Sequence, residues 1–515
     1  MYILGLFNVP WWLFWPIFVV LTFIVYSKYK KSYFSRRGIP GPKPALFLGN
    51  ISAIGKQGLN NFDRKCADRY GPYFGSYYGN HPVLVICDPD IIREITISQF
   101  SKFYDRADTI ETPKRWRDSL NNAKGMKWKY LRSIIQPTFS SAKIKKMRPI
   151  LKRCLNDFIS CLDDKLDDTE NHVIDIYKMY TALTMDIICS TAFGIEVNSQ
   201  KNADDQFVKN ASKVLGVGIT SAVIFLNFLF PDKALRKIIM FLSGDWVDKD
   251  AMKFLTETVR QAVKVRKEER SSEYHDLLKQ MMDTQKMSVE HGISEDKSFE
   301  EMKNDGMSDE DIIINGIIFL AAGYETTSSL LSMATHSLAA YPDCQNRLSS
   351  EIDDVIGQRD DAISYDKILS MEYLGMFLQE TLRMYPPAGR FNRQPNQDVE
   401  IKGLKLLKGE DVAFSTHALH RNPLYWSEPD RFDPERFASH SKDAIVPYSF
   451  IPFGAGPRNC VGMKLASVEV KMAIVRLLQH SRIERSSNFS VPPEITIKGG
   501  ILRPKDGLFV KVVRR

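Results

Sequence analysis

The sequence FGAGPRNCVG, residues Phe453 to Gly462, places one cysteine among three glycines and an arginine, directly before a long helical pattern. Gly454 and Gly456 permit a tight loop with unusual backbone angles, and Cys460 falls where residues Val461 to Leu478 take up helical periodicity. A thiolate at a helix N-terminus, next to an arginine, is favoured by the helix dipole and by the positive charge. We therefore expect a lowered pKa for this thiol, which suits either a nucleophile or a metal ligand.

The loop alone leaves both of these roles open. A cysteine nucleophile needs a base, and none of the nine histidines stands at a patterned distance from Cys460, although a partner that is close only in space is invisible in a sequence. On the order of one chain in several thousand of this length carries five such residues at fixed spacing by chance, so the motif indicates a specific site. The five residues are Phe453, Gly456, Arg458, Cys460 and Gly462.

Composition indicates one large globular unit. The chain has 515 residues, of which 44% are hydrophobic and 26% charged, and no linker, repeat or low-complexity tract divides it. The net charge of +8 comes from scattered basic residues rather than a basic stripe, so we expect no nucleic-acid partner. Seven cysteines without a C-x-x-C pair indicate free thiols, and they argue against a disulfide framework or a zinc site.

The N-terminus is predicted to anchor the chain in a membrane. Residues 2–26 contain no charge and would form a helix of roughly 37 Å, which is long enough to span a bilayer despite Pro10 and Pro16. Five basic residues follow between positions 28 and 37, which places the rest of the chain in the cytosol. A cleaved signal peptide is the alternative, but the segment lacks a basic n-region and a small-residue cleavage site. We expect a basic, proline-rich linker over residues 27–45 and a catalytic domain over 46–515.

The rest of the chain is predicted to be mainly helical with small β-sheets. A short hairpin is expected from Phe74 to Cys87, with its turn over residues 79–82. The apolar segment 222–230 is either a buried core turn or a second, dipping membrane contact, and the polar segment 287–306 is expected to be an exposed loop. Amphipathic periodicity predicts helices over residues 60–70, 128–135, 150–166, 174–192, 249–270 and 371–384.

The longest predicted helix begins at Ser308, whose side chain pairs with Asp311 in a capping box, and runs to about Ala340. Its middle reads AGYETT, residues 322–327. We expect the threonine at 326 to donate its hydroxyl to the carbonyl four residues back, which together with the glycine at 323 would loosen the helix and open a groove for a small ligand. The glutamate at 325 is unfavourable in a buried helix unless it is paired or used.

Two further pairs of residues have helical spacing. Trp128 and Arg132 lie one turn apart, so that an indole N–H and a guanidinium stand side by side as donors for an anion. Glu380 and Arg383 lie on one face of an apolar helix, and Arg436 in the sequence PERF is available as a third partner. Each pair has an ordinary explanation, an interfacial tryptophan in the first case and a solvated ion pair in the second.

Taken together, these motifs resemble a known family. F-x-x-G-x-R-x-C-x-G is similar to the haem-binding signature of the cytochromes P450, the haem-thiolate monooxygenases. The proline hinge, W-x-x-x-R, A-G-x-E-T-T, E-x-x-R and P-E-R-F follow the family order along nearly the whole chain. The wording GIPGP and AGYETTSS resembles the animal microsomal branch that includes drug and steroid hydroxylases. The resemblance implies the cytochrome P450 fold, which is a single large haem-binding domain, mainly α with small β-sheets, around a long central helix.

The resemblance also implies roles for individual residues. Cys460 would supply the thiolate ligand of the iron in haem b, and Phe453 would shield it. Glu325 and Thr326 would deliver protons during oxygen activation. Glu380, Arg383 and Arg436 would fix the proximal face as a buried charge triad. The two haem propionates would be held by Arg458, Trp128, Arg132, Arg393 and Arg106.

The implied activity is insertion of one oxygen atom of O2 into a lipophilic substrate, either a xenobiotic, a steroid or a fatty-acid-like molecule. Electrons would come from NADPH through NADPH-cytochrome P450 reductase, with cytochrome b5 as an optional second partner, at the membrane of the endoplasmic reticulum. The alternatives are a reductase-independent isomerase or dehydratase of peroxides, which needs the acid-alcohol pair less, and a haem sensor. A basic patch for the acidic reductase would comprise Lys127, Lys129, Lys143, Lys145, Lys146 and Arg148. The pocket would be lined from residues 109–120, 214–230, 388–391 and 499–502.

Overall fold

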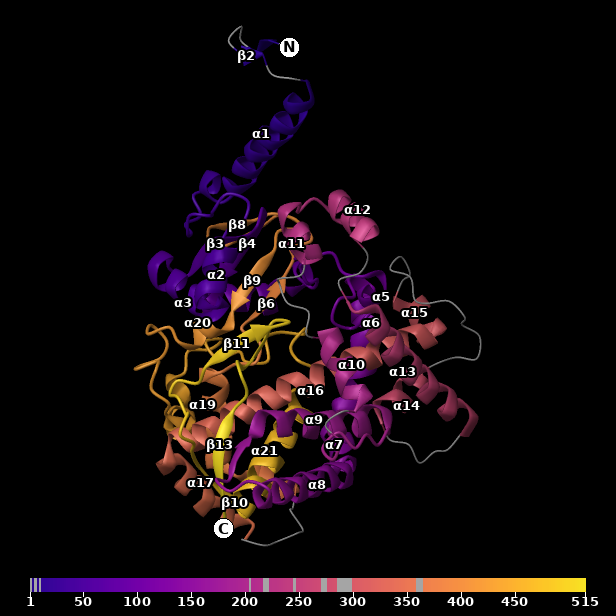
Figure 1. The fold of residues 1–515 in the computed structure, drawn as a ribbon, viewed down its shortest axis with the longest axis vertical. Coiled ribbons are helices and arrows are strands. Elements are labelled where there is room, and N and C mark those ends of the chain that lie inside the picture. The colour runs from indigo at the N-terminus through magenta and orange to yellow at the C-terminus, as the bar shows by residue number, and fades with distance from the viewer. Residues whose placement is uncertain are drawn as a thin grey trace.

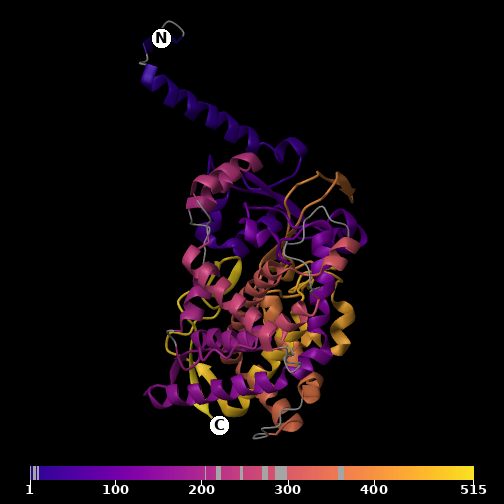
Figure 2. The ribbon, with the colours of Figure 1, turned by 90° about the vertical axis from the view of Figure 1, so that its right-hand side faces the viewer.

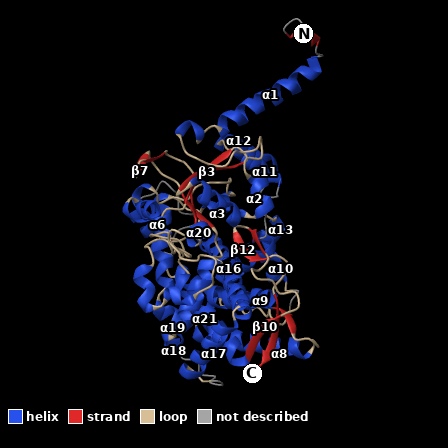
Figure 3. Cartoon of the chain, turned by 90° about the vertical axis from the view of Figure 1, so that its left-hand side faces the viewer, coloured by secondary structure: helices blue, strands red, loops and turns tan. Residues whose placement is uncertain are grey.

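The computed structural model describes residues 2–3, 7–8, 11–202, 205–215, 222–243, 247–269, 276–284, 299–357 and 365–515. Helices dominate these residues, as predicted, and the strands form small sheets between them (Figure 1, Figure 3). The helices up to residue 243 are α1 Trp11–Lys31, α2 Ile51–Gln57, α3 Leu59–Tyr70, α4 Pro89–Arg93, α5 Lys114–Arg117, α6 Gly125–Ile135, α7 Ser141–Lys146, α8 Arg148–Asp167, α9 Ile176–Phe193, α10 Gln206–Leu215, α11 Ala222–Leu229 and α12 Lys233–Ser243. The later helices are α13 Lys249–Glu269, α14 Leu277–Met282, α15 Phe299–Asp305, α16 Asp309–Ala340, α17 Pro342–Val355, α18 Tyr365–Ser370, α19 Glu372–Met384, α20 Thr416–His420 and α21 Met463–His480.

A four-stranded sheet with the order β3-β4-β9-β6 joins segments that are far apart in the chain. β3 pairs antiparallel with β4, which confirms the predicted hairpin, and β4 pairs parallel with β9, so that Leu84 lies beside Val412. This parallel pairing is the step that brings the segment around residue 411 to the wall of the site described below. The strands of this sheet are β3 Tyr73–Tyr78, β4 His81–Ile86, β9 Val412–Ser415 and β6 Arg390–Arg393. The others are β1 Tyr2–Ile3 with β2 Phe7–Asn8, β10 Ser481–Arg485 with β13 Phe509–Arg514 and β5 Val173–Asp175, β11 Ile495–Lys498 with β12 Ile501–Pro504, and β7 Val399–Ile401 with β8 Leu404–Leu406.

Helix α16 forms the centre of the body and packs against α9, α13, α19, α21 and β12. Its predicted bounds and capping box are confirmed, because the Ser308 side chain accepts from the Asp311 N–H and the Asp311 side chain accepts in return. A Cβ atom at Gly323 would lie 2.7 Å from the side chain of Ile188 on α9. The glycine therefore allows α9 and α16 to approach closely, and the helix continues through this position without interruption.

The N-terminal segment differs from the predicted single helix over residues 2–26. Residues 2–8 include the strand pair β1-β2, and α1 begins at Trp11 and extends to Lys31, with three lysines in its last turn. The helix projects from the body at the N-terminal end of the molecule (Figure 1, Figure 2). Within the described ranges, the structure contains no helix that combines the length and the apolar character required to cross a membrane. The next residues pack on the sheet, since the Gly75 N–H donates to the carbonyl of Pro40 at 2.8 Å.

Two segments form helices where the sequence indicated otherwise. Residues 222–229 are helix α11, so the prediction of a core turn is wrong; one face of α11 is buried, with Phe228 stacked 5.1 Å from Tyr78. Within the segment 287–306, which was predicted to be an exposed loop, residues 299–305 form α15, and Met302 is fully buried. Residues 287–298 lie outside the described residues. In both segments a few apolar side chains find partners from distant parts of the chain, which local patterns do not reveal.

Candidate functional site

The cysteine loop is closed by its own backbone. The Cys460 N–H donates to the carbonyl of Phe453 at 2.9 Å, and Gly454 and Gly456 both have positive φ, at 75° and 74°. A Cβ atom at Gly456 would lie 2.0 Å from the carbonyl oxygen of Thr96, so only glycine fits this position. Helix α21 begins three residues after the cysteine, and the loop therefore presents the sulfur just before the helix N-terminus.

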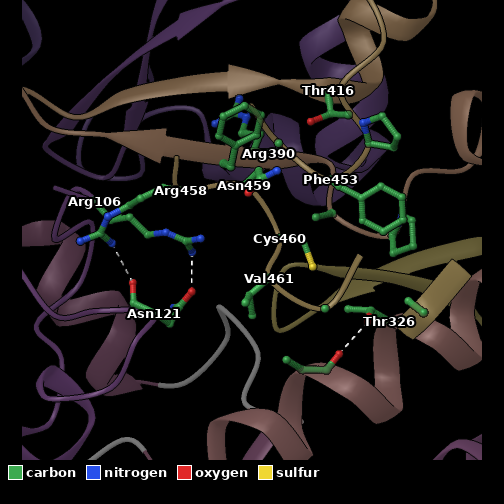
Figure 4. Close-up of a pocket in the computed structure, with 18 of the residues that line it drawn as sticks. Arg106, Asn121, Thr326, Arg390, Thr416, Phe453, Arg458, Asn459, Cys460 and Val461 are labelled. Atoms are coloured by element: carbon green, nitrogen blue, oxygen red, sulfur yellow. Dashed lines mark hydrogen bonds between the residues drawn. The ribbon is translucent and has the colours of Figure 1, made fainter. Parts of the chain in front are cut away.

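The Cys460 sulfur faces a cavity rather than bulk solvent (Figure 4). Burial raises the pKa of the thiol, while the backbone N–H of Gly462 and then the cations of Arg132 and Arg106 lower it. Burial is the larger effect, so the sequence-based prediction of a lowered pKa is wrong for the protein chain by itself. The predicted donors are nevertheless in place, and a bound metal cation would add the charge that deprotonates a thiol outright.

The cavity has a volume of about 530 Å³, within the range of ligand-binding pockets. On one side lies the cysteine loop, and on the other lies α16, which contributes Ala322, Gly323 and Thr326 (Figure 4). The Thr326 hydroxyl donates to the carbonyl of Ala322 at 2.6 Å, which confirms the predicted contact. Most of the remaining wall is apolar, with side chains such as Phe319 and Leu330. A flat group bound above the sulfur would therefore face a threonine across a largely apolar space.

Four arginines with few anionic partners surround the cysteine side of the cavity. The Nε atoms of Arg106, Arg393 and Arg458 are buried and make no hydrogen bond. Burial lowers the pKa of Arg458 to about 8 and that of Arg393 to about 9, and it also lowers the pKa of Arg106 and Arg132. The nearest carboxylate to Arg458 is that of Asp105, at 3.9 Å. Buried cations of this kind require a counter-charge, so the cluster fits an anionic ligand with more than one carboxylate.

Trp128 and Arg132 lie in this cluster, as their spacing predicted. The Arg132 guanidinium binds the backbone and side-chain oxygens of Asn459, both at 2.9 Å, which ties α6 to the cysteine loop. The Arg458 guanidinium stacks over the indole of Trp128 at 4.5 Å, and Arg106 and Arg458 both donate to Asn121 (Figure 4). These contacts hold the guanidinium groups at the rim of the cavity.

The comparisons with known proteins agree with this geometry. The family model described as cytochrome P450 matches residues 39–512. The chain is a cytochrome P450. It is 35% identical to cytochrome P450 3A13 of Mus musculus over 99% of this chain and 97% of that protein, and 35% identical to cytochrome P450 3A5 of Homo sapiens over 98% and 96%. It is 34% identical to cytochrome P450 3A6 of Oryctolagus cuniculus over 99% and 98%.

Members of this family bind haem b through a cysteine thiolate, and the residues present fit such a group. The open space beside Gly462 suits a flat ring, because a Cβ atom there would make only an ordinary contact, 3.8 Å from Phe139. The guanidinium groups of Arg106, Arg393 and Arg458, whose Nε atoms make no hydrogen bond, suit the two haem carboxylates. The P450 is therefore a haem-thiolate protein of the monooxygenase family.

Glu325 is placed differently from its neighbour Thr326. Its carboxylate is buried, accepts from Arg503 on β12 at 2.9 Å, and does not belong to the described wall of the cavity. Burial raises the pKa of this carboxyl, and Arg503 and Lys498 oppose the rise. The two residues that sequence analysis paired thus face different surroundings. In the observed conformation Glu325 is an ion-pair partner of β12.

The predicted charge triad is present between α19 and the segment around Arg436. Arg383 binds Glu380 through two N–H···O contacts of 2.7 Å, and both side chains are fully buried. The Asp433 N–H donates to Glu380 at 2.7 Å, and Arg436 Nε lies 3.6 Å from the same carboxylate. Because a lone buried charge is strongly unfavourable, this network fixes α19 to the loop that precedes the cysteine segment.

The predicted pocket segments are only partly confirmed. Residues from 109–120 and 388–391 line the cavity, whereas no described residue of 214–230 or 499–502 does. The polar wall residues Asn392 and Asp411 are not among those predicted from the sequence. A lone aspartate directly before the apolar strand VAFS was a usable signal for the latter. The proposed basic patch also changes, since Lys127 is buried and paired with Asp118.

Proposed function

We propose that this P450 is a membrane-bound monooxygenase that inserts one atom of O2 into a lipophilic substrate, with electrons from NADPH through a flavoprotein reductase. The observation that carries this proposal is the placement of Cys460 and Thr326 on opposite sides of one largely apolar cavity. A thiolate ligand and an alcohol across a water-poor space suit oxygen activation. A reductase-independent isomerase needs the alcohol less.

Bound haem would supply the reduction and cleavage of dioxygen; the chain holds, orients and shields it. Cys460 would bind the iron, with Phe453 beside it. Arg106, Arg393 and Arg458 would neutralise the two propionates, and in return their unpaired N–H groups would gain acceptors. Arg132 and Trp128 would fix the loop and the stacked guanidinium group. Gly456 would keep the loop in its closed shape. These contacts explain why the cluster is cationic although the substrate space is apolar.

Thr326 would hold the proton that the reaction needs at Oγ1. In the structure this proton points to the Ala322 carbonyl, and both groups border the cavity. Rotation of the side chain would redirect the hydroxyl towards the reacting oxygen while the carbonyl waits as the alternative acceptor. Glu325 would replenish the proton by leaving Arg503, because its raised pKa makes it a better proton carrier near neutral pH than an ordinary carboxyl.

The reductase would dock beside the cysteine loop. A second hollow of about 590 Å³ is bordered by Gly456 and Asn459 of the cysteine loop and by Lys129 and Arg132 on α6. Lys129 is exposed at this hollow, and Lys146 is exposed on α7. These two positive charges suit an acidic partner. Electrons would enter over a short path, since the loop that borders this hollow also holds the cysteine.

The N-terminal helix and α12 would attach the P450 to the membrane of the endoplasmic reticulum, with the catalytic domain in the cytosol. α1 contacts the end of α11, with Phe23 and Phe230 at 5.2 Å between ring centres, and Lys30 binds Asp232 at 3.3 Å. Phe241 on α12 is 87% exposed and Leu242 is 78% exposed, so α12 presents apolar side chains to its surroundings. α12 lies at the end of the body from which α1 projects (Figure 1).

The test is oxygen transfer by the haem-loaded protein with NADPH, reductase and a panel of lipophilic substrates under isotopically labelled dioxygen. We expect one labelled oxygen in the product and consumption of NADPH that depends on the reductase. Product formed from a peroxide without reductase, and unlabelled by dioxygen, would instead assign the chain to the isomerase or dehydratase class.

A further inference from the structure

A small polar cluster stands in the largely apolar cavity wall, next to the arginine cluster, because the Asn392 carbonyl accepts from Arg393 at 2.8 Å. It consists of Thr109, Asn392 on β6 and Asp411 directly before β9, and all three line the cavity. Apolar neighbours in the same wall include Val83 and Ala413. Asp411 is only 4% exposed, so its carboxylate faces the cavity and the protein rather than bulk water. A buried carboxylate in a lipophilic pocket needs an explanation, because its desolvation is costly.

The two carboxylate oxygens of Asp411 differ in their hydrogen bonds. Oδ2 accepts from the Thr109 hydroxyl at 2.6 Å and lies 3.2 Å from His81 Nε2. Oδ1 has one long contact, 3.4 Å to the amide nitrogen of Asn392. A carboxylate can accept about four hydrogen bonds. Oδ1 therefore keeps capacity for a donor that enters the cavity.

The contact between His81 and Arg236 determines which nitrogen of His81 donates to Asp411. Arg236 on α12 lies 2.9 Å from His81 Nδ1, and because arginine only donates, Nδ1 must accept and the ring proton sits on Nε2. Burial lowers the pKa of His81, so the ring is neutral near pH 7. His81 thus donates a hydrogen bond to Oδ2. Oδ1 remains the less engaged oxygen of the Asp411 carboxylate.

Nearby cations are committed elsewhere. Arg390 also lines the cavity, but it forms a buried ion pair with Asp63 and donates to the Tyr78 hydroxyl at 2.9 Å. The arginines around the cysteine loop would be engaged by the haem carboxylates. A ligand that ended in a carboxylate would thus meet Asp411 as a like charge. Arg236, on the far side of His81, already binds His81 Nδ1 and the carbonyl of Asp108.

We propose that Asp411 Oδ1 is a recognition point for an N–H or O–H donor, a hydroxyl or ammonium group, at one end of an otherwise lipophilic substrate. The inference rests on the proposed function and narrows its substrate class. It disfavours the fatty-acid-like substrates that the sequence left open. The apolar remainder of the ligand would extend along the wall towards Thr326 on α16.

The test measures binding rather than turnover, by calorimetry on the haem-loaded protein without reductase. The probes are dodecan-1-ol, its methyl ether, dodecanoate and N,N-dimethyldodecylammonium, which differ only at one end. We expect the alcohol and the ammonium to bind about 10- to 100-fold more tightly than the ether, as a hydrogen bond to a charged acceptor implies, and dodecanoate to bind more weakly still. Equal affinities for alcohol and ether would overturn the proposal.

Variants locate the effect. Asp411→Val should abolish the preference for alcohol over ether and leave ether binding within about twofold, because only the acceptor is lost. Asp411→Asn keeps the shape and should weaken the ammonium by about tenfold or more while sparing the alcohol. Asp108→Asn removes a nearby carboxylate that is not part of the cavity wall, so it should leave all four affinities unchanged.

If Asp411→Val does not fold, Asp411→Asn alone decides, and an unchanged ratio of ammonium to ether affinity in that variant refutes the assignment. Failure of the proposed function gives a different result. A protein that binds alcohol selectively but transfers no oxygen keeps this subsite and loses the monooxygenase proposal. A protein that transfers oxygen but shows no preference for the end group keeps the monooxygenase proposal and loses this subsite.

Discussion

Glu469 on α21 tests whether burial in the interior of this P450 keeps a carboxyl group neutral. Its side chain is buried, lines the cavity, and leaves Oε1 without a hydrogen-bond partner. Burial raises the pKa of this carboxyl from its ordinary value of 4.5 to about 8. At pH 7 the folded protein therefore holds Glu469 neutral, whereas the unfolded chain ionises it.

The sign and the size of the effect follow from linkage. Between the ordinary pKa and the folded pKa the folded state binds one proton more than the unfolded state, so stability falls as pH rises through this window. Each pH unit corresponds to about 1.36 kcal/mol, which gives about 3 kcal/mol lost by pH 7 and about 5 kcal/mol above pH 8. Glu469→Gln removes this titration and keeps the shape of the neutral acid.

The assay is denaturant unfolding of the haem-loaded protein at several pH values, compared between the variant and the wild type. We expect equal stability near pH 4.5 and a variant that is more stable by about 3 kcal/mol at pH 7, with no further gain beyond about pH 8.5. Glu400→Gln, at an exposed position, serves as the control and should show no such trend. A stability difference that does not change between pH 5 and pH 8 would refute a carboxyl held neutral by burial.

Three further outcomes test the site. Thr326→Ala should raise peroxide leakage and lower the product formed per NADPH, and unchanged coupling would remove its role in proton delivery. Cys460→Ser should abolish the thiolate-type spectrum of the reduced carbonyl complex; survival of that spectrum would overturn the ligand assignment. Arg503→Gln removes the ion-pair partner of Glu325, so the pKa of that carboxyl should rise further. The free energy of unfolding should then fall by about 3 kcal/mol at pH 7 but little at pH 5, while Arg503→Lys should retain most of the stability. Equal stability of the two variants at pH 7 would contradict the ion pair.

Local sequence patterns were sufficient to predict the elements whose structure depends on neighbouring residues in the chain. The bounds of α16 followed from apolar periodicity and from the capping box at Ser308, and the closed cysteine loop followed from its glycines. The position of Glu325 was partly readable as well. Adjacent side chains on a helix point about 100° apart, so their adjacency alone does not place Glu325 in the same cavity as Thr326.

Contacts between segments that are distant in the chain could not be predicted from the sequence. Asp411 reaches the cavity wall because β9 pairs in parallel with β4, more than 300 residues earlier in the chain, and nothing in either strand announces that partner. Lys127 looked like a surface lysine beside other basic residues, yet the fold buries it against Asp118 and Asp311. In both cases the partner of a charged residue was decided by topology rather than by spacing.

The error about the Cys460 pKa has a physical reason that bears on assembly. In the chain alone, burial disfavours the charged form of the thiol and of the nearby arginines, which lowers the pKa of Arg458 to about 8 while it raises that of the cysteine. Bound iron would offset the cost of the buried thiolate, and the two haem carboxylates would offset the cost of the buried arginine charges. The chain therefore holds a site whose electrostatic costs are complementary to one ligand, so haem binding should stabilise the fold as well as supply the chemistry.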